Sequence, residues 1–173
     1  DLLIKPAQLK FLDISPGDSI LDIACGNGQF SRTMCELGAN VIATDVSPFM
    51  ISNAKKRTPD TLKNLSFRVL DATDCSDLVK LGEGVFDSVV CTMALFDISD
   101  IEPLIKSIPH LIKPTGQFVF SILHPAFNSP PENKSIVGIP LTPYFVGVFG
   151  SLSMLCLAIT ISFANSSEIS SNV

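Results

Sequence analysis

The sequence predicts a doubly wound α/β domain, in which a mainly parallel sheet is the middle of three layers. Short apolar runs alternate with helical patterns from Ser19 to Leu123, as expected for a parallel sheet that helices cover on both faces. A glycine turn follows the first run, and acidic residues follow the second and third. A chain of 173 residues with 46% hydrophobic composition is long enough for one large core.

Five apolar runs are the expected strands of this sheet. Each run has the length of a strand, and turn residues or a helical pattern separate it from the next. The runs are Ser19–Ala24, Asn40–Thr44, Leu65–Leu70, Phe86–Cys91 and Gln117–Leu123.

Crossover helices are expected between these strands, because apolar residues recur there at helical spacing. The first of these segments carries Phe30, Met34 and Leu37. A later segment carries Ile101, Leu104, Ile105, Ile108, Leu111 and Ile112.

Cap and turn residues help to place the helix ends. Ser47 followed by Pro48 predicts a helix start, since a hydroxyl caps the first turn and proline lacks an N–H that this turn does not need. Ser99 to Glu102 has the pattern of a capping box, with Pro103 as the alternative first helical residue. The Lys-Pro-Thr-Gly run at 113–116 predicts the helix end and a turn into the fifth strand.

Charge and cysteine content limit the classes of function. The net charge of −5, from 12 Lys and Arg against 17 Asp and Glu, gives no broad positive field, so nucleic acid is not an expected partner. The five cysteines are odd in number and lack C-x-x-C spacing, which favours a reducing, cytoplasmic compartment. The chain starts at Asp1 rather than Met, so its sequence does not speak to a targeting peptide upstream.

A glycine turn joins the first strand to the first crossover helix. Gly26 and Gly28 flank Asn27 there, and glycine lets the backbone turn sharply and lets a ligand approach main-chain atoms. A glycine pair after a strand is also compatible with a simple turn, so the residues that follow decide its meaning.

Two carboxylates follow the next two strands. Asp45 ends the second strand, where it can accept hydrogen bonds from both hydroxyls of a ribose above the glycine turn. Asp71 follows the third strand on the same carboxyl-end edge, where open α/β sheets bind ligands. The alternative for Asp45 is a solvated side chain or a cap for the helix near Ser47.

From Ser19 to about Ser129 the sequence resembles class I S-adenosylmethionine-dependent methyltransferases, with the motifs of that family in their expected order. Residues 20–28 (Ile-Leu-Asp-Ile-Ala-Cys-Gly-Asn-Gly) are similar to the first motif, with Ala24 where glycine is more usual. The resemblance implies a Rossmann-like sheet in which the third strand is followed by the second, first, fourth and fifth. It also implies S-adenosylmethionine as the cofactor and methyl transfer as the activity.

The resemblance places nine residues around the cofactor: Asp22, Ala24, Gly26, Asn27, Gly28, Asp45, Val46, Asp71 and Ala72. The glycine backbone faces the methionine part, with Asp22 supporting the loop and the amino group. Asp45 holds the ribose, Asp71 accepts from the adenine amino group, and the Ala72 backbone contacts the ring edge.

Few catalytic side chains are expected, because the sulfonium methyl group is already electrophilic and needs mainly an aligned nucleophile and exclusion of water. The segment 91–97 resembles the family's loop beside the reactive methyl, which makes Met93 and Asp97 weak substrate candidates. His124 ends the fifth strand and is a weak candidate for taking a proton from a substrate hydroxyl. Its alternative is a structural role before Pro125. No metal is expected.

The C-terminal part departs from the family pattern. A methyltransferase core is expected at residues 1–134, followed by an atypical hydrophobic tail at 135–173 in place of the last strands of the family sheet. Within it, residues 144–164 hold 15 apolar residues among 21, enough for a possible transmembrane helix. The alternatives are a divergent terminus packed on the open sheet edge and a disordered tail.

The expected function is methyl transfer from S-adenosylmethionine to an undetermined small-molecule or protein acceptor. An inactive remnant of a nucleotide-binding fold is the main alternative, and a nicotinamide-dependent oxidoreductase is the next. Phe30 and Ser31 disfavour the oxidoreductase, because a dinucleotide fingerprint wants a small residue there. A tail-anchored protein with a cytosolic domain is the alternative to a cytoplasmic one, since all 12 Lys and Arg precede the apolar segment.

Overall fold

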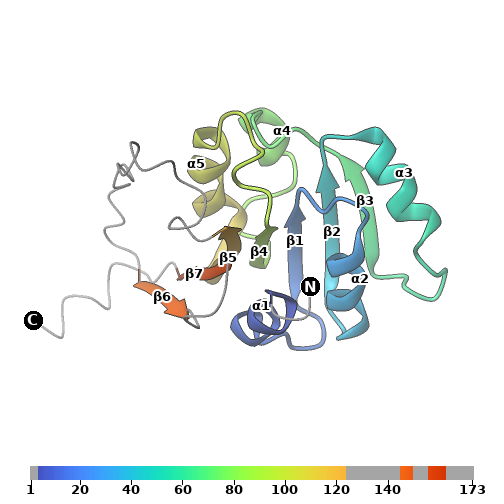
Figure 1. The fold of residues 1–173 in the computed structure, drawn as a ribbon, viewed down its shortest axis with the longest axis horizontal. Helices are drawn as coiled ribbons and strands as arrows, with labels where there is room; N and C mark the ends of the chain where they lie inside the picture. The colour runs from blue at the N-terminus through green and yellow to red at the C-terminus, as the bar shows by residue number, and fades with distance from the viewer. Residues whose placement is uncertain (1–3, 124–144, 150–155, 163–173) are drawn as a thin grey trace, which may run out of the picture.

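The computed structural model describes residues 4–123, 145–149 and 156–162. These form one seven-stranded sheet in the order β3-β2-β1-β4-β5-β7-β6, with β3 at the right of Figure 1 and β6 at the left. The strands are β1 (Ser19–Ile23), β2 (Asn40–Asp45), β3 (Leu65–Val69), β4 (Phe86–Thr92), β5 (Ile112–Leu123), β6 (Phe145–Phe149) and β7 (Cys156–Ser162). The helices are α1 (Ile4–Leu12), α2 (Gln29–Glu36), α3 (Pro48–Lys56), α4 (Cys75–Val79) and α5 (Glu102–Leu111).

Two hydrophobic cores cover the two faces of the sheet, which makes three layers. Alternate residues of one strand enter different cores, as in β1, where Ile20 joins one core and Leu21 the other. Helices α1, α2 and α3 contribute to the core with Ile20, and helices α4 and α5 to the core with Leu21. The predicted doubly wound, three-layered fold is therefore confirmed.

The five predicted strands are all present, and four of them match their expected bounds within one residue. Strand β5 begins at Ile112, five residues before the expected start at Gln117, so Ile112 belongs to the strand and not to the helix. Strands β1 to β5 pair in parallel in the expected order, with Leu21 opposite Ile42 on β2 and Val89 on β4. Their carboxyl ends consequently lie at one edge of the sheet, which is where the glycine turn and the acidic residues are found.

The helix predictions have a mixed outcome. Ser47 caps α3 as predicted, because its Oγ accepts a hydrogen bond from the N–H of Met50 at 3.3 Å and Pro48 follows in the first turn. Helix α5 begins at Glu102 after Ile101, and no side chain of Ile101 caps it, so the capping box from Ser99 is wrong. Instead the Asp100 carboxylate accepts from the Glu102 N–H at 3.0 Å.

Two further boundary predictions need correction. Leu37 was expected as an apolar position of the first crossover helix, but its side chain is 47% exposed. Helix α2 ends at Glu36, so Leu37 lies beyond the helix and does not reach the core. The run 113–116 ends a helix as predicted, but it belongs to β5 as an irregular segment rather than a separate turn. It is held there by Lys113, whose ammonium donates to both oxygens of Asp87 at 2.8 Å.

The expectation that the last strands of the sheet are missing is wrong. Strand β7 pairs antiparallel with β5 from Gln117 opposite Ser162 to Leu123 opposite Cys156, and β6 pairs antiparallel with β7. Two described parts of the predicted transmembrane segment 144–164 are therefore strands. Within the ranges that the structure describes, no helix has the length and apolar character to cross a membrane. The division at residue 134 stays a prediction.

Candidate functional site

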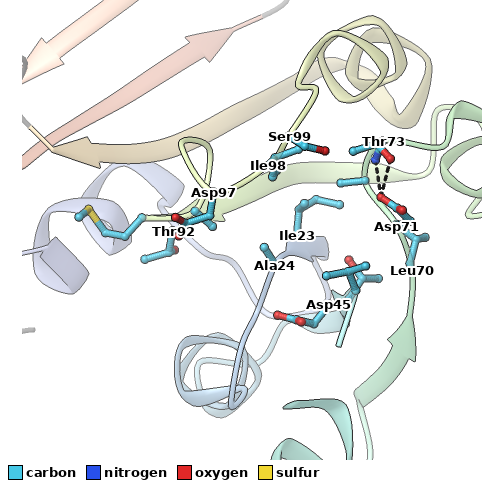
Figure 2. Close-up of a pocket in the computed structure, with 15 residues that line it drawn as sticks. Ile23, Ala24, Asp45, Leu70, Asp71, Thr73, Thr92, Asp97, Ile98 and Ser99 are labelled. Atoms are coloured by element: carbon cyan, nitrogen blue, oxygen red, sulfur yellow. Dashed lines mark hydrogen bonds between the residues drawn. The ribbon is translucent and has the colours of Figure 1, made fainter. Parts of the chain in front are cut away.

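A cavity of about 480 Å³ opens at the carboxyl ends of strands β1 to β4, which is within the usual size range of small-ligand sites. Its walls combine strand ends with the loops after them. Figure 2 shows Leu70 and Asp71 on one side of Ile23 and Ala24, and Thr92 and Asp97 on the other. The lining residues are Ile23, Ala24, Thr44, Asp45, Val46, Leu70, Asp71, Ala72, Thr73, Thr92, Met93, Ala94, Asp97, Ile98 and Ser99.

The glycine turn forms a tight loop between β1 and α2. Gly26 and Gly28 have φ values of 55° and 72°, in the left-handed region that glycine adopts without cost. The Gly28 N–H donates to the Cys25 carbonyl at 3.0 Å, and Gly28 then leads into α2. Ala24 also has a positive φ of 55°, which gives the physical reason why glycine is more usual at this position.

Gly28 is required for a reason other than the approach of a ligand. A Cβ at Gly28 would lie 2.6 Å from Cε1 of Phe67 and 3.1 Å from Cβ of Ala54, so protein side chains occupy that space. At Gly26 a Cβ would meet nothing within 4 Å. Of the two glycines, only Gly28 is therefore excluded from carrying a side chain by packing.

The Asp45 carboxylate ties the glycine turn to the start of α3. Oδ2 accepts a hydrogen bond from the Gly26 N–H at 2.9 Å, and Oδ1 accepts from the Ser47 N–H at 2.9 Å. Because a carboxylate offers about four acceptor sites, these two bonds leave further sites open to a ligand. Asp45 therefore both shapes the loop and presents acceptors at the cavity wall.

Asp22 lies beneath the loop and is 1% exposed. Its Oδ2 accepts from the Ser31 hydroxyl on α2 at 2.6 Å. Burial raises the pKa of this carboxyl to about 7, the Ser31 hydrogen bond opposes that rise, and the Asp45 charge adds to it. Asp22 is not among the residues that line the cavity, so it acts from below, through α2 and the loop.

Asp71 lies at the opposite side of the cavity, just after β3. Its Oδ1 accepts from both the backbone N–H of Thr73 at 2.9 Å and the Thr73 hydroxyl at 2.7 Å (Figure 2). These bonds lower the pKa of the Asp71 carboxyl, so it stays ionised. The neighbouring Ala72 is 9% exposed and adds a small apolar surface to the wall.

The loop after β4 forms the wall that faces β1. Met93 has a positive φ of 55°, and its N–H is held by both the carbonyl and the hydroxyl of Ser121, each at 3.0 Å. Strained backbone at a non-glycine residue of this kind is concentrated at functional sites. Asp97 lines the same wall, four residues farther along the loop.

The two cysteines near the cavity are not activated thiols. Burial, with a contribution from the Asp22 charge, raises the pKa of Cys91 to about 12. Burial and the charges of Asp22 and Asp45 also raise the pKa of Cys25. Both thiols are therefore protonated at neutral pH and unsuited to act as nucleophiles.

Comparison with known proteins identifies the family. The methyltransferase domain family matches residues 21–120, which include the glycine turn, both predicted carboxylates and the loop after β4. The chain belongs to the methyltransferase domain family. The match and the fold together support the class I S-adenosylmethionine-dependent group, as the motifs predicted.

Three similar proteins show how much of the chain shares sequence or fold with known methyltransferases. The ubiquinone biosynthesis O-methyltransferase of Xanthomonas campestris pv. campestris is 32% identical over 124 residues, which are 70% of this chain and 51% of that protein. The chain thus spans about half the length of the curated relatives it matches. A SAM dependent methyltransferase from Aquifex aeolicus shares the fold, with a TM-score of 0.73 at 17% identity over 92% of this chain and 89% of that one.

A third relative supports the cofactor. An S-adenosylmethionine dependent methyltransferase from Mesorhizobium loti has a TM-score of 0.64 and 30% identity, over 72% of this chain and 56% of that one. Together with the family match, this supports S-adenosylmethionine as the cofactor of this member of the methyltransferase domain family.

The structure brings most of the predicted site residues together at the cavity. Seven of them line it: Ala24, Asp45, Val46, Asp71, Ala72, Met93 and Asp97. Gly26, Asn27 and Gly28 form the adjoining loop, and Asp22 lies beneath it. His124 lies outside the described residues, so its candidacy is untested.

Other lining residues were not predicted from the sequence, among them Thr44, Thr73, Thr92 and Ser99. Thr44 and Thr92 lie at strand ends, and Thr73 and Ser99 lie in the loops after β3 and β4, which is a signal that sequence reasoning can use. A hydroxyl at such a position has no distinctive spacing, however, so nothing separates it from an ordinary surface residue.

Proposed function

We propose that the chain transfers the methyl group of S-adenosylmethionine to a small-molecule or protein acceptor held over the carboxyl ends of the strands. One observation carries the proposal: Asp45 and Asp71 stand on opposite sides of one cavity, beside a left-handed glycine loop. An adenosine carries hydroxyl and amino donors at two ends, and two separated carboxylates are suited to accept from them.

The residues present fit the cofactor. In the proposed arrangement the open acceptor sites of Asp45 take the ribose hydroxyls, and Val46 covers the same side. The Asp71 Oδ2, which Thr73 does not use, accepts from the adenine amino group, while Ala72 lies against the ring edge. The backbone of the loop from Ala24 to Gly28 faces the methionine part.

The chain's own residues have a limited part in the chemistry. The bound cofactor supplies an electrophilic methyl group, so the protein must orient the acceptor and exclude water. Met93 and Asp97 lie on the wall after β4 and are the proposed substrate contacts. His124 is kept as a proposed proton acceptor for a hydroxyl substrate.

For the methyl acceptor, we propose classes of molecules and not a single compound. The relative from Xanthomonas campestris pv. campestris is an O-methyltransferase, so hydroxyl-bearing small molecules are the first acceptors to test. Protein acceptors remain within the proposal, and nucleic acid is disfavoured by the net charge of −5. A cytoplasmic location, favoured by the cysteine pattern, stays a prediction.

The two alternative functions have less support. The hypothesis of an inactive remnant depends on the loss of the last strands of the sheet. Strands β6 and β7 are present in the described part of the sheet, which removes this support. The nicotinamide-dependent oxidoreductase is disfavoured by the match of residues 21–120 to the methyltransferase domain family. The glycine loop alone does not decide between the two, because Ser31 is a small residue at the third position of a dinucleotide fingerprint.

Calorimetric titration tests the proposal directly. S-adenosylhomocysteine should bind with one site per chain, and a nicotinamide dinucleotide should not bind, because residues 21–120 match the methyltransferase domain family. A preference for the dinucleotide would favour the oxidoreductase, and binding of neither would favour the remnant. A screen of hydroxyl-bearing acceptors with S-adenosylmethionine then tests activity.

A further inference from the structure

Helix α3 carries exposed apolar side chains at its start. Phe49 is 71% exposed and Met50 is 41% exposed, although folding normally buries large apolar side chains of this kind. The helix lies at the right of Figure 1, beside the edge strand β3. Val46, which is 62% exposed just before the helix, extends this apolar surface to the cavity wall. Apolar side chains grouped on a surface commonly mark an interaction site.

Basic side chains lie at the other end of the same helix. Lys55 and Lys56 are in its last turn, Arg57 is its C-cap residue, and all three are exposed. Together with Lys63, which is exposed in the loop to β3, they make up four of the 12 Lys and Arg residues of a chain whose net charge is −5. Positive charge is therefore concentrated beside α3 in an otherwise acidic molecule.

These four cations are not neutralised by nearby carboxylates. None of them forms an ion pair within the described ranges, whereas Lys80, Lys106 and Lys113 each do. Cations in the last turn also suit the negative end of the helix dipole, which accounts in part for those at the end of α3. The helix dipole explains neither Lys63 nor the exposure of Phe49 at the opposite end.

A shallow hollow of about 270 Å³ lies among the basic residues. Lys55 and Lys63 both line it, and Asp60 is the one carboxylate of its described lining. Leu62 and Leu65 add apolar surface to the same hollow. Two ammonium groups beside apolar surface suit a phosphate group that carries an aliphatic chain, as a phospholipid does.

The apolar and basic residues share the outward side of α3. Ile51 and Ala54 are buried and so define the inward side of the helix. Phe49 and Lys56 are seven residues apart, which is close to two helical turns, so they lie in one row about 10 Å apart along the helix axis. This arrangement allows the aromatic ring to enter the apolar layer of a membrane surface while the ammonium groups contact headgroup phosphates.

We propose that the outward side of α3 docks on an anionic phospholipid surface, with its exposed apolar side chains in the apolar boundary and its basic side chains at the headgroups. The inference goes beyond the proposed methyl transfer and does not depend on it. A protruding aromatic side chain needs a pocket in a protein partner, whereas a lipid surface accepts it without one. A nucleic acid backbone would account for the cations alone. Acidic residues farther than about 8 Å from the lipid are largely screened at physiological ionic strength.

Vesicle flotation tests the proposal on the full chain, and flotation separates binding from aggregation. The wild type should float with phosphatidylcholine vesicles that contain roughly one third phosphatidylglycerol, and not with phosphatidylcholine alone, because both charge and apolar insertion are needed. Binding should weaken as NaCl is raised from roughly 0.1 M to roughly 0.5 M, since salt screens the charges.

Two variants test the two parts of the surface. The double variant Lys55→Gln/Lys56→Gln should bind anionic vesicles roughly ten- to thirtyfold more weakly, since each cation contributes about fivefold. Phe49→Ser should bind roughly tenfold more weakly, because it removes the inserted ring. All three side chains are exposed, so both variants should fold, which circular dichroism and the thermal midpoint check.

Matched controls lie on the opposite face of the sheet, with helices α4 and α5. The double variant Lys80→Gln/Lys106→Gln makes the same change of net charge at two exposed lysines. Val79→Ser removes an apolar side chain that is 57% exposed on α4. Both controls should bind anionic vesicles as tightly as the wild type.

Three results with vesicles would overturn the inference. A wild type that does not float with anionic vesicles would contradict it directly. An equal loss of binding in Lys55→Gln/Lys56→Gln and in its lysine control would show that only the net charge matters. Wild-type binding by both α3 variants would place the lipid contact elsewhere on the chain.

Fluorescence anisotropy with labelled polyglutamate and with single-stranded RNA tests other partners for the same surface. The wild type should bind both more weakly than it binds anionic vesicles. Tighter binding of polyglutamate, lost in Lys55→Gln/Lys56→Gln, would assign the surface to an acidic protein and reject the lipid. The same result with RNA would assign it to a nucleic acid.

Discussion

Gly28 and Gly26 look equivalent in the sequence, but only Gly28 faces other side chains. Both have positive φ values, so alanine at either position carries a strain of about 1–2 kcal/mol. At Gly28 the added Cβ also meets the Phe67 ring at 2.6 Å. We therefore expect Gly28→Ala to lower the free energy of unfolding by roughly 2–4 kcal/mol, and Gly26→Ala by about 1–2 kcal/mol.

Urea unfolding without ligand measures this difference. Adding Phe67→Leu to Gly28→Ala should recover part of the loss, because a smaller side chain frees the space. Equal costs for the two single alanine variants would mean that Gly28 is needed only for its backbone conformation.

Asp45 combines a loop role with the proposed ribose contact. Asp45→Ala should weaken binding of S-adenosylhomocysteine by roughly 1.5–3 kcal/mol, the scale for hydrogen bonds to a charged group. It should also destabilise the protein, since the N–H groups of Gly26 and Ser47 lose their acceptor. Calorimetry and urea unfolding measure the two effects separately.

Asp87→Ala is the control for Asp45→Ala. Asp87 accepts from the Ser19 N–H at 2.8 Å and from Lys113, at the amino ends of the strands. Its loss should affect stability while ligand affinity stays the same. If a folded Asp45→Ala protein bound the ligand as tightly as the wild type, Asp45 would not belong to the site.

Asp22 should give the protein a distinctive pH dependence. Its pKa is raised by burial from 3.8 to about 7, so between these values the folded chain holds a proton that the unfolded chain has released. Stability from this group is thus largest at low pH and falls by up to about 1.4 kcal/mol per pH unit as the pH rises to 7. Above pH 7 the contribution is constant.

Asp22→Asn should remove that slope, because an amide does not titrate and its oxygen can still accept from Ser31. Urea unfolding of both proteins from pH 4.5 to 8 measures this slope. The free energy of unfolding of the variant, relative to that of the wild type, should increase as the pH rises to 7. Parallel stability curves would show that Asp22 is ionised in the folded protein throughout this range.

At the scale of elements, sequence reasoning succeeded where a pattern has one physical cause. The five parallel strands are short apolar runs because both faces of the sheet are buried, and the bounds of all but the start of β5 were predicted within one residue. Helix α1 was missed because Pro6 and the buried polar Gln8 interrupt its apolar pattern. Proline is harmless here, since it lies in the first helical turn, where an N–H is not needed.

The cap of α3 can be tested as an isolated element. Ser47→Ala should lower the free energy of unfolding by about 1 kcal/mol, because the Met50 N–H loses its acceptor at the helix start. Ser52→Ala is the matched control on the same helix, where Ser52 is exposed and alanine favours the helix slightly. Thermal unfolding of both variants distinguishes a cap effect from a general effect of serine removal.

At the scale of the whole molecule, the cofactor side of the site was more predictable than the sheet around it. The places of Asp45 and Asp71 at the cavity can be predicted from the sequence. Each carboxylate is located by the strand end that lies beside it in the sequence. The pairing of β5 with β7 depends instead on contacts between distant segments, and the uncharged stretch that contains β6 and β7 suits a membrane helix and a buried strand equally. Only the tertiary partner, β5, distinguishes these two structures.

Strands β6 and β7 should therefore be needed for the stability of the entire sheet. Truncation after Lys134 would remove both strands and leave β5 as an edge whose N–H and C=O groups lose their partners on β7, from Gln117 to Leu123. An exposed edge of this length is prone to pair with a second chain. We expect the truncated chain to unfold at a lower temperature and to form larger species in size-exclusion chromatography.

Hydrogen exchange locates the effect within the sheet. Protection should fall most in β5, which loses its neighbour, and least in β2 and β3 on the far side, where the partner strands are intact. The Asp45 and Asp71 positions lie on that far side, so any truncated monomer should keep part of its affinity for S-adenosylhomocysteine. A truncated chain that is monomeric and as stable as the full chain would show instead that β4 and β5 need no further strands, and that the sheet is complete with five.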